Sequence, residues 1–166
     1  MKKILLSLVV AVLLASSATV AMAAPGGVTG SGALKDLATA RQATAKYHDV
    51  SVAIADGYVP ASPCISAPPG VMGIHYVNFG LVDDTVNLTT PEILLYVATD
   101  GGMKLVGVEY MAVSVGQPAP TLFGRAMNGP MPGHGPGEPE HFDLHVWLWQ
   151  GNPNGIFEAF NPKVKC

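Results

Sequence analysis

The spacing of apolar residues predicts one long helix near the start of the chain. Apolar side chains recur at helical intervals within an alanine-rich stretch, at Leu34, Leu37, Ala38, Tyr47, Val50 and Ile54. Gly57 provides the residue that commonly ends a helix. The pattern therefore predicts a helix over residues 33–56, with an apolar stripe available for packing.

The second part of the chain has the pattern of β-strands. Runs rich in β-branched, apolar and aromatic residues predict strands at 73–79, 92–99, 104–114 and 141–150. Asp100, Gly101 and Gly102 separate the second and third runs and predict a tight hairpin. Residues 156–160 predict a short closing strand. Residues 124–140 are too rich in glycine and proline for regular structure.

One helix followed by four or five antiparallel strands indicates the α+β class. The simplest arrangement packs the long N-terminal helix on one face of a curved antiparallel sheet. The alternative is a small barrel resembling the cupins. Either arrangement would make residues 33–166 a single globular domain.

The first residues have the layout of a secretory signal peptide. Lys2 and Lys3 precede the apolar run ILLSLVVAVLL, and Ala21-Met22-Ala23 matches a signal-peptidase site. We expect cleavage after Ala23, which leaves about 143 residues and a flexible segment over 24–32. The alternative is an uncleaved membrane anchor, although the apolar run is short for a span. The prediction is a secreted or periplasmic bacterial protein with no membrane span after cleavage.

Net charge bears on the class of binding partner, and cysteine content bears on disulfide bonding. Loss of Lys2 and Lys3 takes the formal net charge from −3 to −5, and no basic run remains, which argues against nucleic acid as a partner. Cys64 and Cys166 form an even set in an exported chain, which favours a disulfide bond. A thiolate metal ligand and a free nucleophile are the alternatives.

The stretch HFDLHVW carries the strongest chemical signal. On a strand, His141, Asp143 and His145 would share one face, because successive side chains point to opposite sides. Imidazole and carboxylate groups are the usual ligands of zinc and copper. His141 and His145 would lie about 13–14 Å apart along an ideal strand, too far for both to bind one ion.

Two residues on other predicted strands complete the candidate site. His75 lies in GIHYVNF, and Glu109 lies in the apolar stretch VGVEYM on a face shared with Leu105, Gly107 and Met111. An unpartnered buried carboxylate is costly, so Glu109 needs solvent, a hydrogen-bonding partner or a metal. The predicted ligands of a divalent metal, zinc or copper, are His145, His75 and Glu109 from the strands, with His141 or His134 supplied by the edge of the loop. The predicted pocket neighbours are Tyr76, Asn78, Tyr110, Asp143 and Trp147.

The Gly/Pro-rich loop offers a second ligand set. Met127, Met131 and His134 are soft or borderline ligands that suit Cu(I). Methionine also fills gaps in apolar cores, so core packing is the alternative. His48 lies beside Asp49 on the predicted helix, and we expect it at the surface.

Several motifs together resemble a family of small secreted bacterial proteins with no established activity. They are PASPC, MGIHYVN, LVGVEY, GPMPGH, HFDLHVWLW and NPNGIFEAFNP, followed by the terminal Cys166. The resemblance covers residues 45–166. It implies a single exported domain and supplies no catalytic residues.

Three functions fit these observations. The first is an exported domain that binds a divalent metal or a small ligand in a His/Glu pocket. The second is an enzyme that uses a metal or a His/Glu acid–base pair on a small molecule. The third is a non-catalytic interaction protein of the cell envelope, with the Gly/Pro loop as its contact surface.

Overall fold

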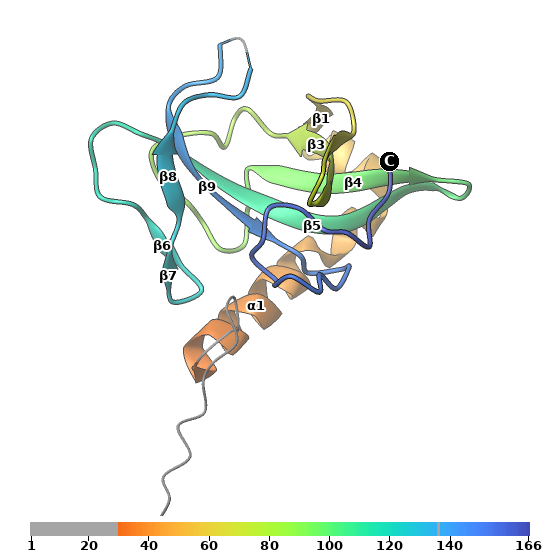
Figure 1. Ribbon diagram of the computed structural model, residues 1–166, viewed down its shortest axis with the longest axis horizontal. Helices are drawn as coiled ribbons and strands as arrows, with labels where there is room; N and C mark the ends of the chain where they lie inside the picture. Colours follow the sequence, from red (N-terminus) through yellow and green to blue (C-terminus); the bar gives the residue numbers. More distant parts are fainter. Residues whose placement is uncertain (1–29, 136) are drawn as a thin grey trace, which may run out of the picture.

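The computed structural model describes residues 30–135 and 137–166. The predicted signal peptide and residues 24–29 lie outside this range. The described chain has an α+β fold with a large antiparallel sheet (Figure 1). Its elements are α1 (Ser31–Thr44), η1 (Ala45–His48), α2 (Val50–Ala55), β1 (Val59–Pro60), β2 (Ile65–Ala67), β3 (Gly70–Val77), β4 (Ile93–Thr99), β5 (Gly102–Val113), β6 (Thr121–Leu122), β7 (Arg125–Ala126), β8 (Asn128–Met131) and β9 (His141–Val146).

The prediction of one long helix is wrong, because the helical stretch is broken at Asp49. This residue has φ −90° and ψ 107°, and its carboxylate accepts a hydrogen bond from the Ser51 amide as the N-cap of α2. An aspartate at this position favours the start of a new helix over continuation of the old one. Gly57, with φ 96°, follows the end of α2 as predicted.

The main sheet has the order β1-β3-β4-β5-β9-β8, and β2 pairs with β3. All of the pairings are antiparallel, and the β4–β5 hairpin closes with Thr99 opposite Gly102, as predicted. Among the described residues the sheet is open, with β1 and β8 at its ends, so it does not form the cupin-like barrel kept as an alternative. With seven strands it is larger than the predicted four or five.

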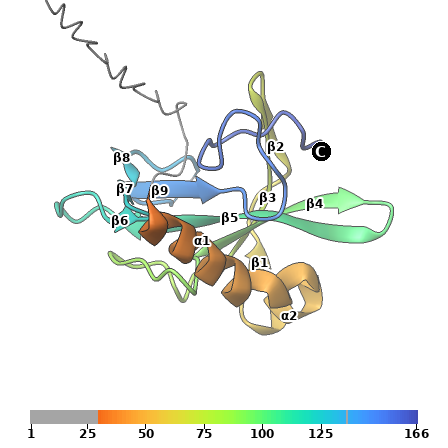
Figure 2. The same cartoon turned by 90° about the horizontal axis from the view of Figure 1, so that it is seen from below.

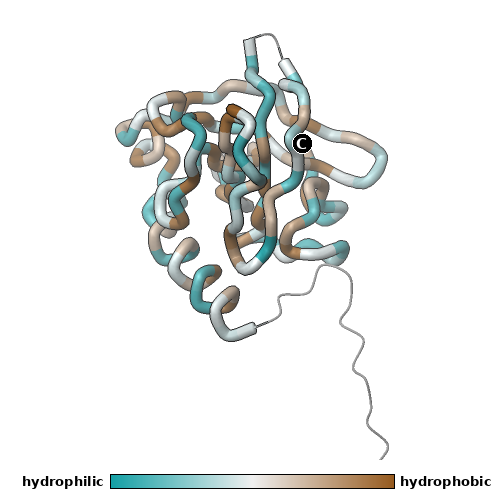
Figure 3. Tube along the Cα trace, turned by 90° about the vertical axis from the view of Figure 1, so that its left-hand side faces the viewer, coloured by the Kyte–Doolittle hydropathy of each residue, from teal (hydrophilic) through white to brown (hydrophobic). Residues whose placement is uncertain are grey.

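The two faces of the sheet are covered differently. The helices lie on one face, and β2 and the C-terminal segment lie on the other (Figure 2). Along α1, hydrophobic and hydrophilic residues are interspersed (Figure 3). Its buried residues, Ala33, Ala40 and Thr44, are small, which allows α1 to approach the sheet closely.

The last third of the chain departs from two predictions. The glycine- and proline-rich stretch 124–140 contains the short strands β7 and β8, and β8 pairs with β9 at the sheet edge. Residues 156–160 form turns, and their predicted strand is absent from the described structure. Pairing near this segment is limited to an isolated bridge between Val71 and Asn161.

A disulfide bond joins Cys64 and Cys166, as predicted, and ties the last residue to the segment just before β2. Cys64 packs against the apolar cluster on the sheet face opposite the helices. In the part of the chain that the structure describes, none of the helices is long and apolar enough to cross a membrane.

Candidate metal centre

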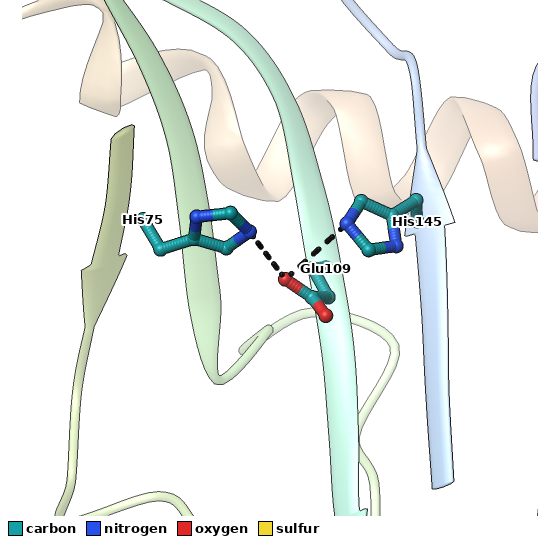
Figure 4. Close-up of side chains that lie close together, drawn as sticks. All are labelled: His75, Glu109 and His145. Atoms are coloured by element: carbon teal, nitrogen blue, oxygen red, sulfur yellow. Dashed lines mark ion pairs between the residues drawn. The ribbon is translucent and has the colours of Figure 1, made fainter. Parts of the chain in front are cut away.

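Three side chains from three strands converge on the sheet face opposite the helices (Figure 4). His75 lies on β3, Glu109 on β5 and His145 on β9. The Nε2 atoms of His75 and His145 lie 3.3 and 3.6 Å from the same oxygen, Oε2 of Glu109. We call these three residues the inner triad.

Strand register explains this convergence. Glu109 and His145 are direct cross-strand partners, so their side chains stand next to each other on one face. His75 pairs with Leu95 on the intervening strand β4, and Leu95 pairs in turn with Gly107. His75 therefore approaches Glu109 diagonally, across β4.

A β-bulge sets the face on which Glu109 lies. Tyr96 pairs with Leu105, but Leu95 pairs with Gly107, so β5 has one extra residue at Val106. The extra residue places Leu105 among the helix-side core residues, whereas Glu109 stands on the opposite face with Met111. The prediction that Leu105 shares a face with Glu109 is therefore wrong.

The inner triad is buried and only partly satisfied. The exposed fractions of the side chains are 14% for His75, 7% for Glu109 and 2% for His145. Glu109 Oε2 and both ring nitrogens of His145 are buried without a hydrogen-bond partner among the described residues. An unsatisfied buried polar atom costs about 1–3 kcal/mol, so three in one place indicate a site for an additional group.

The charges of the triad depend on one another. Burial alone would raise the pKa of Glu109, but the imidazoles of His145 and His75 outweigh it and lower that pKa to about 2. Burial opposes protonation of His75, yet the Glu109 carboxylate overcomes it and raises the pKa of His75. Glu109 is therefore an anion at neutral pH, and the site favours positive charge next to it.

Ser62 orients the ring of His75. Its Oγ accepts a hydrogen bond from the His75 backbone amide at 3.0 Å and donates one to the Pro63 carbonyl at 2.8 Å. Oγ also lies 3.0 Å from His75 Nδ1, and these contacts hold the ring with Nε2 directed at Glu109 Oε2.

The other two predicted histidines lie apart from this triad. His141 contributes, with His134 and Glu138, to a second group of residues at the start of β9. His141 and His145 thus belong to different groups, which agrees with the strand-length argument against one shared ion. His48 is at the surface, as predicted, with its ring 4.3 Å from that of Trp149.

Several predicted pocket residues face away from the triad. Tyr76 and Tyr110 pack in the helix-side core, and Asn78 donates a hydrogen bond to the Asp56 carbonyl. Asp143 does share the triad's face, with Oδ2 3.9 Å from His145 Nδ1. Trp147 is buried in the apolar cluster on that face.

Two further residues lie on the helix side. Trp149 follows the end of β9 at Val146, where the chain turns, and its ring packs against Arg41 and His48. Met127 is buried in the helix-side core, which favours core packing over copper binding for this residue. Met131 lies half-buried in β8, opposite His141.

The sequence pattern did not identify two residues that contact the candidate ligands, Ser62 and Glu138. Ser62 had no signal beyond its place two residues before Cys64 in the PASPC motif. Glu138 could have been found from the spacing His134-x3-Glu138-x2-His141, which places a carboxylate between two imidazoles of one loop.

Comparison of the chain with protein-family models, with curated proteins and with solved structures returned no match.

Proposed function

We propose that the protein binds one divalent metal ion through His75 Nε2, Glu109 Oε2 and His145 Nε2. The observation that carries this proposal is the convergence of these buried atoms, two of which lack hydrogen-bond partners among the described residues. A cation between them would satisfy all three atoms and neutralise the buried carboxylate.

The spacing of the atoms supports an ion of zinc size. Tetrahedral zinc, with bonds of about 2.0–2.1 Å to its ligands, places those ligands about 3.3 Å from one another. The two histidine nitrogens lie 3.3 and 3.6 Å from Glu109 Oε2. One potential ligand atom from each residue lies within 4.8 Å of the other two, so rotation of the imidazole rings would be needed to bring all three atoms to bonding distance.

The ligand types favour zinc or copper. Two imidazoles and one carboxylate suit borderline divalent ions, whereas magnesium and calcium prefer sites built from oxygen atoms. The disulfide bond is compatible with the predicted exported location, because disulfides persist in oxidising compartments.

The second candidate function is metal-dependent catalysis. Three protein ligands leave a fourth position for water or substrate, which is the arrangement of catalytic rather than structural zinc sites. His75 is the most exposed of the three ligands and marks the side from which a small molecule would enter. Turnover of a panel of hydrolysable esters and amides by the metal-loaded protein tests this function.

Elemental analysis by mass spectrometry tests metal binding. The chain would be exported to the periplasm of a bacterial host and purified without an affinity tag or chelator. We expect near-stoichiometric zinc or copper in the wild type and less than a tenth of that content in His75→Ala and in His145→Ala. His48→Ala is the matched control, because it removes an exposed imidazole outside both groups.

Two results would contradict the proposal. One is wild-type protein that stays metal-free even after dialysis against zinc or copper. The other is a metal content that the two triad variants leave unchanged. Circular dichroism of each variant would show whether it is folded, so that loss of metal is not confused with loss of structure.

A further inference from the structure

A second group of potential ligands lies in the loop between β8 and β9. It consists of His134, Glu138 and His141, and we call it the outer cluster. His141 is almost fully buried at the start of β9, Glu138 is partly buried, and His134 is exposed. One potential ligand atom from each residue lies within 4.8 Å of the other two.

The tautomer of His141 is fixed by its backbone contact. Its Nδ1 lies 2.9 Å from the Pro139 carbonyl oxygen, which can only accept a hydrogen bond, so Nδ1 carries the proton. The Nε2 lone pair of the neutral ring then points toward Glu138 Oε1, at 3.8 Å. A metal-binding histidine characteristically donates its other ring N–H to a carbonyl or carboxylate in this way.

Glu138 is also oriented by the loop. Its Oε2 accepts hydrogen bonds from the backbone amides of His134 and Gly135, at 2.7 and 3.1 Å. Oε1 is thereby left on the side of His141. The rings of His134 and His141 stand nearly perpendicular, at 84°, with centroids 5.1 Å apart. Two acceptor atoms and a second imidazole thus surround one point.

The backbone of the loop is shaped for this approach. A side chain at Gly133 would collide with the backbone of Glu138, so only glycine allows the two segments of the loop to come so close. The close approach keeps His134 and Glu138 together at the mouth of the loop.

We propose that the outer cluster binds a second divalent metal ion, of the zinc or copper class, near the protein surface. The site is separate from the inner triad, because His141 and His145 are four positions apart on β9, about 13–14 Å along an ideal strand. It includes an exposed ligand, so its ion exchanges with solvent more readily than an ion in the inner triad. The inference does not depend on the function proposed for the inner triad.

Isothermal titration with zinc chloride tests the proposal on metal-stripped protein with its disulfide intact. We expect two ions per chain in the wild type and in the control His48→Ala. The double variant His75→Ala/His145→Ala removes the inner triad and should retain one ion. The double variant His134→Ala/Glu138→Gln leaves buried His141 in place and should weaken the outer ion at least tenfold while keeping the inner one.

The outcomes separate the two sites. Absence of zinc binding by the inner-triad variant, while it remains folded, would overturn the outer site and leave the inner site standing. Loss of the single bound ion in the outer variant alone would support the outer site and overturn the inner one. Equal affinity of the wild type and the outer variant for both ions would also overturn the outer site.

Discussion

Buried polar side chains on the two faces of the sheet differ in whether they have hydrogen-bond partners. On the helix side, tyrosine hydroxyls are bound by the backbone: Tyr58 donates to the Pro91 carbonyl, Tyr96 to that of Tyr47 and Tyr110 to that of Leu88. On the other face, Glu109 and His145 have buried atoms without such partners among the described residues.

This difference distinguishes polar groups that the fold satisfies from those that belong to the proposed metal site. A buried tyrosine whose hydroxyl donates to a backbone carbonyl has its hydrogen-bonding group satisfied, and it stabilises the packing of helices and loops on the sheet. The indole N–H of Trp149 is the exception on the helix side. The inner triad keeps buried atoms without hydrogen-bond partners among the described residues, and the proposed metal ion would satisfy them.

The largest expected effect concerns the disulfide bond on the triad's face. Replacement of both cysteines, Cys64→Ser with Cys166→Ser, should lower the free energy of unfolding by about 4–5 kcal/mol at most, because the bond closes a loop with a sequence separation of 102. Urea unfolding would measure the loss. A change below about 1 kcal/mol would mean that the bond does not constrain the unfolded chain.

Leu94 and Leu95 offer a direct comparison of the two faces. They are adjacent on β4, both fully buried, and belong to the helix-side core and the opposite cluster respectively. Each change to alanine should cost about 2–5 kcal/mol. Only Leu95→Ala should also weaken zinc binding to the inner triad, by about tenfold, because Leu95 pairs with His75. Equal effects on zinc affinity would contradict the separation of the faces.

Glu92 and Glu109 are both buried carboxylates, but their pKa values shift in opposite directions. Burial, opposed by a hydrogen bond from the Met111 amide and reinforced by the charges of Asp83 and Glu109, raises the pKa of Glu92 to about 7. The folded protein therefore holds a proton that the unfolded chain has already released above pH 4.5. The free energy of unfolding should fall by about 3 kcal/mol as the pH rises from about 4.5 to about 7.

Glu92→Gln should abolish most of that decline, since the amide oxygen can still accept the Met111 hydrogen bond and carries no charge. Urea unfolding at a series of pH values would measure it. A variant with the same pH dependence as the wild type would show that another group causes the decline.

Ser62→Ala tests the orientation of His75. Loss of the hydroxyl frees Nδ1, so the affinity of the inner triad for zinc should fall about 10–100-fold while the fold persists. The comparison is a zinc titration of this variant beside the wild type. Unchanged affinity would show that the ring is held by packing alone.

The smallest expected effect belongs to the helix side. Tyr96→Phe removes the hydrogen bond to the Tyr47 carbonyl and should cost about 0.5–1.5 kcal/mol without any change in zinc affinity. Thermal unfolding with and without zinc would measure both quantities. A loss of zinc binding in this variant would show that the two faces are coupled.

The sequence predicted the strands β3, β4, β5 and β9 and singled out the three residues of the inner triad, because alternation and β-branched runs are local signals. It did not predict the break at Asp49, where a short side chain competes with the helical hydrogen bonds. It also could not assign partners across strands. His75 and Glu109 meet across β4, and that depends on the register of three strands rather than on any local pattern.

The outer cluster was also not predicted from the sequence pattern. Alternation along β9 places His141 with His145, but the neighbours of His141 come from the loop that precedes it. The glycine- and proline-rich stretch predicts no element on which Glu138 could be placed. Side chains brought together by an irregular loop have no periodicity by which to be found.

The extra residue at Val106 shifts the in-and-out alternation of side chains along β5 by one position. Upstream of it, even-numbered positions such as Lys104 stand on the triad's face; downstream, the odd-numbered Gly107, Glu109 and Met111 do. Removal of one residue there would keep every amino acid of the site and turn Glu109 toward the helices. Whether the site forms therefore depends on the number of residues in this part of β5 as much as on the identity of the three triad residues.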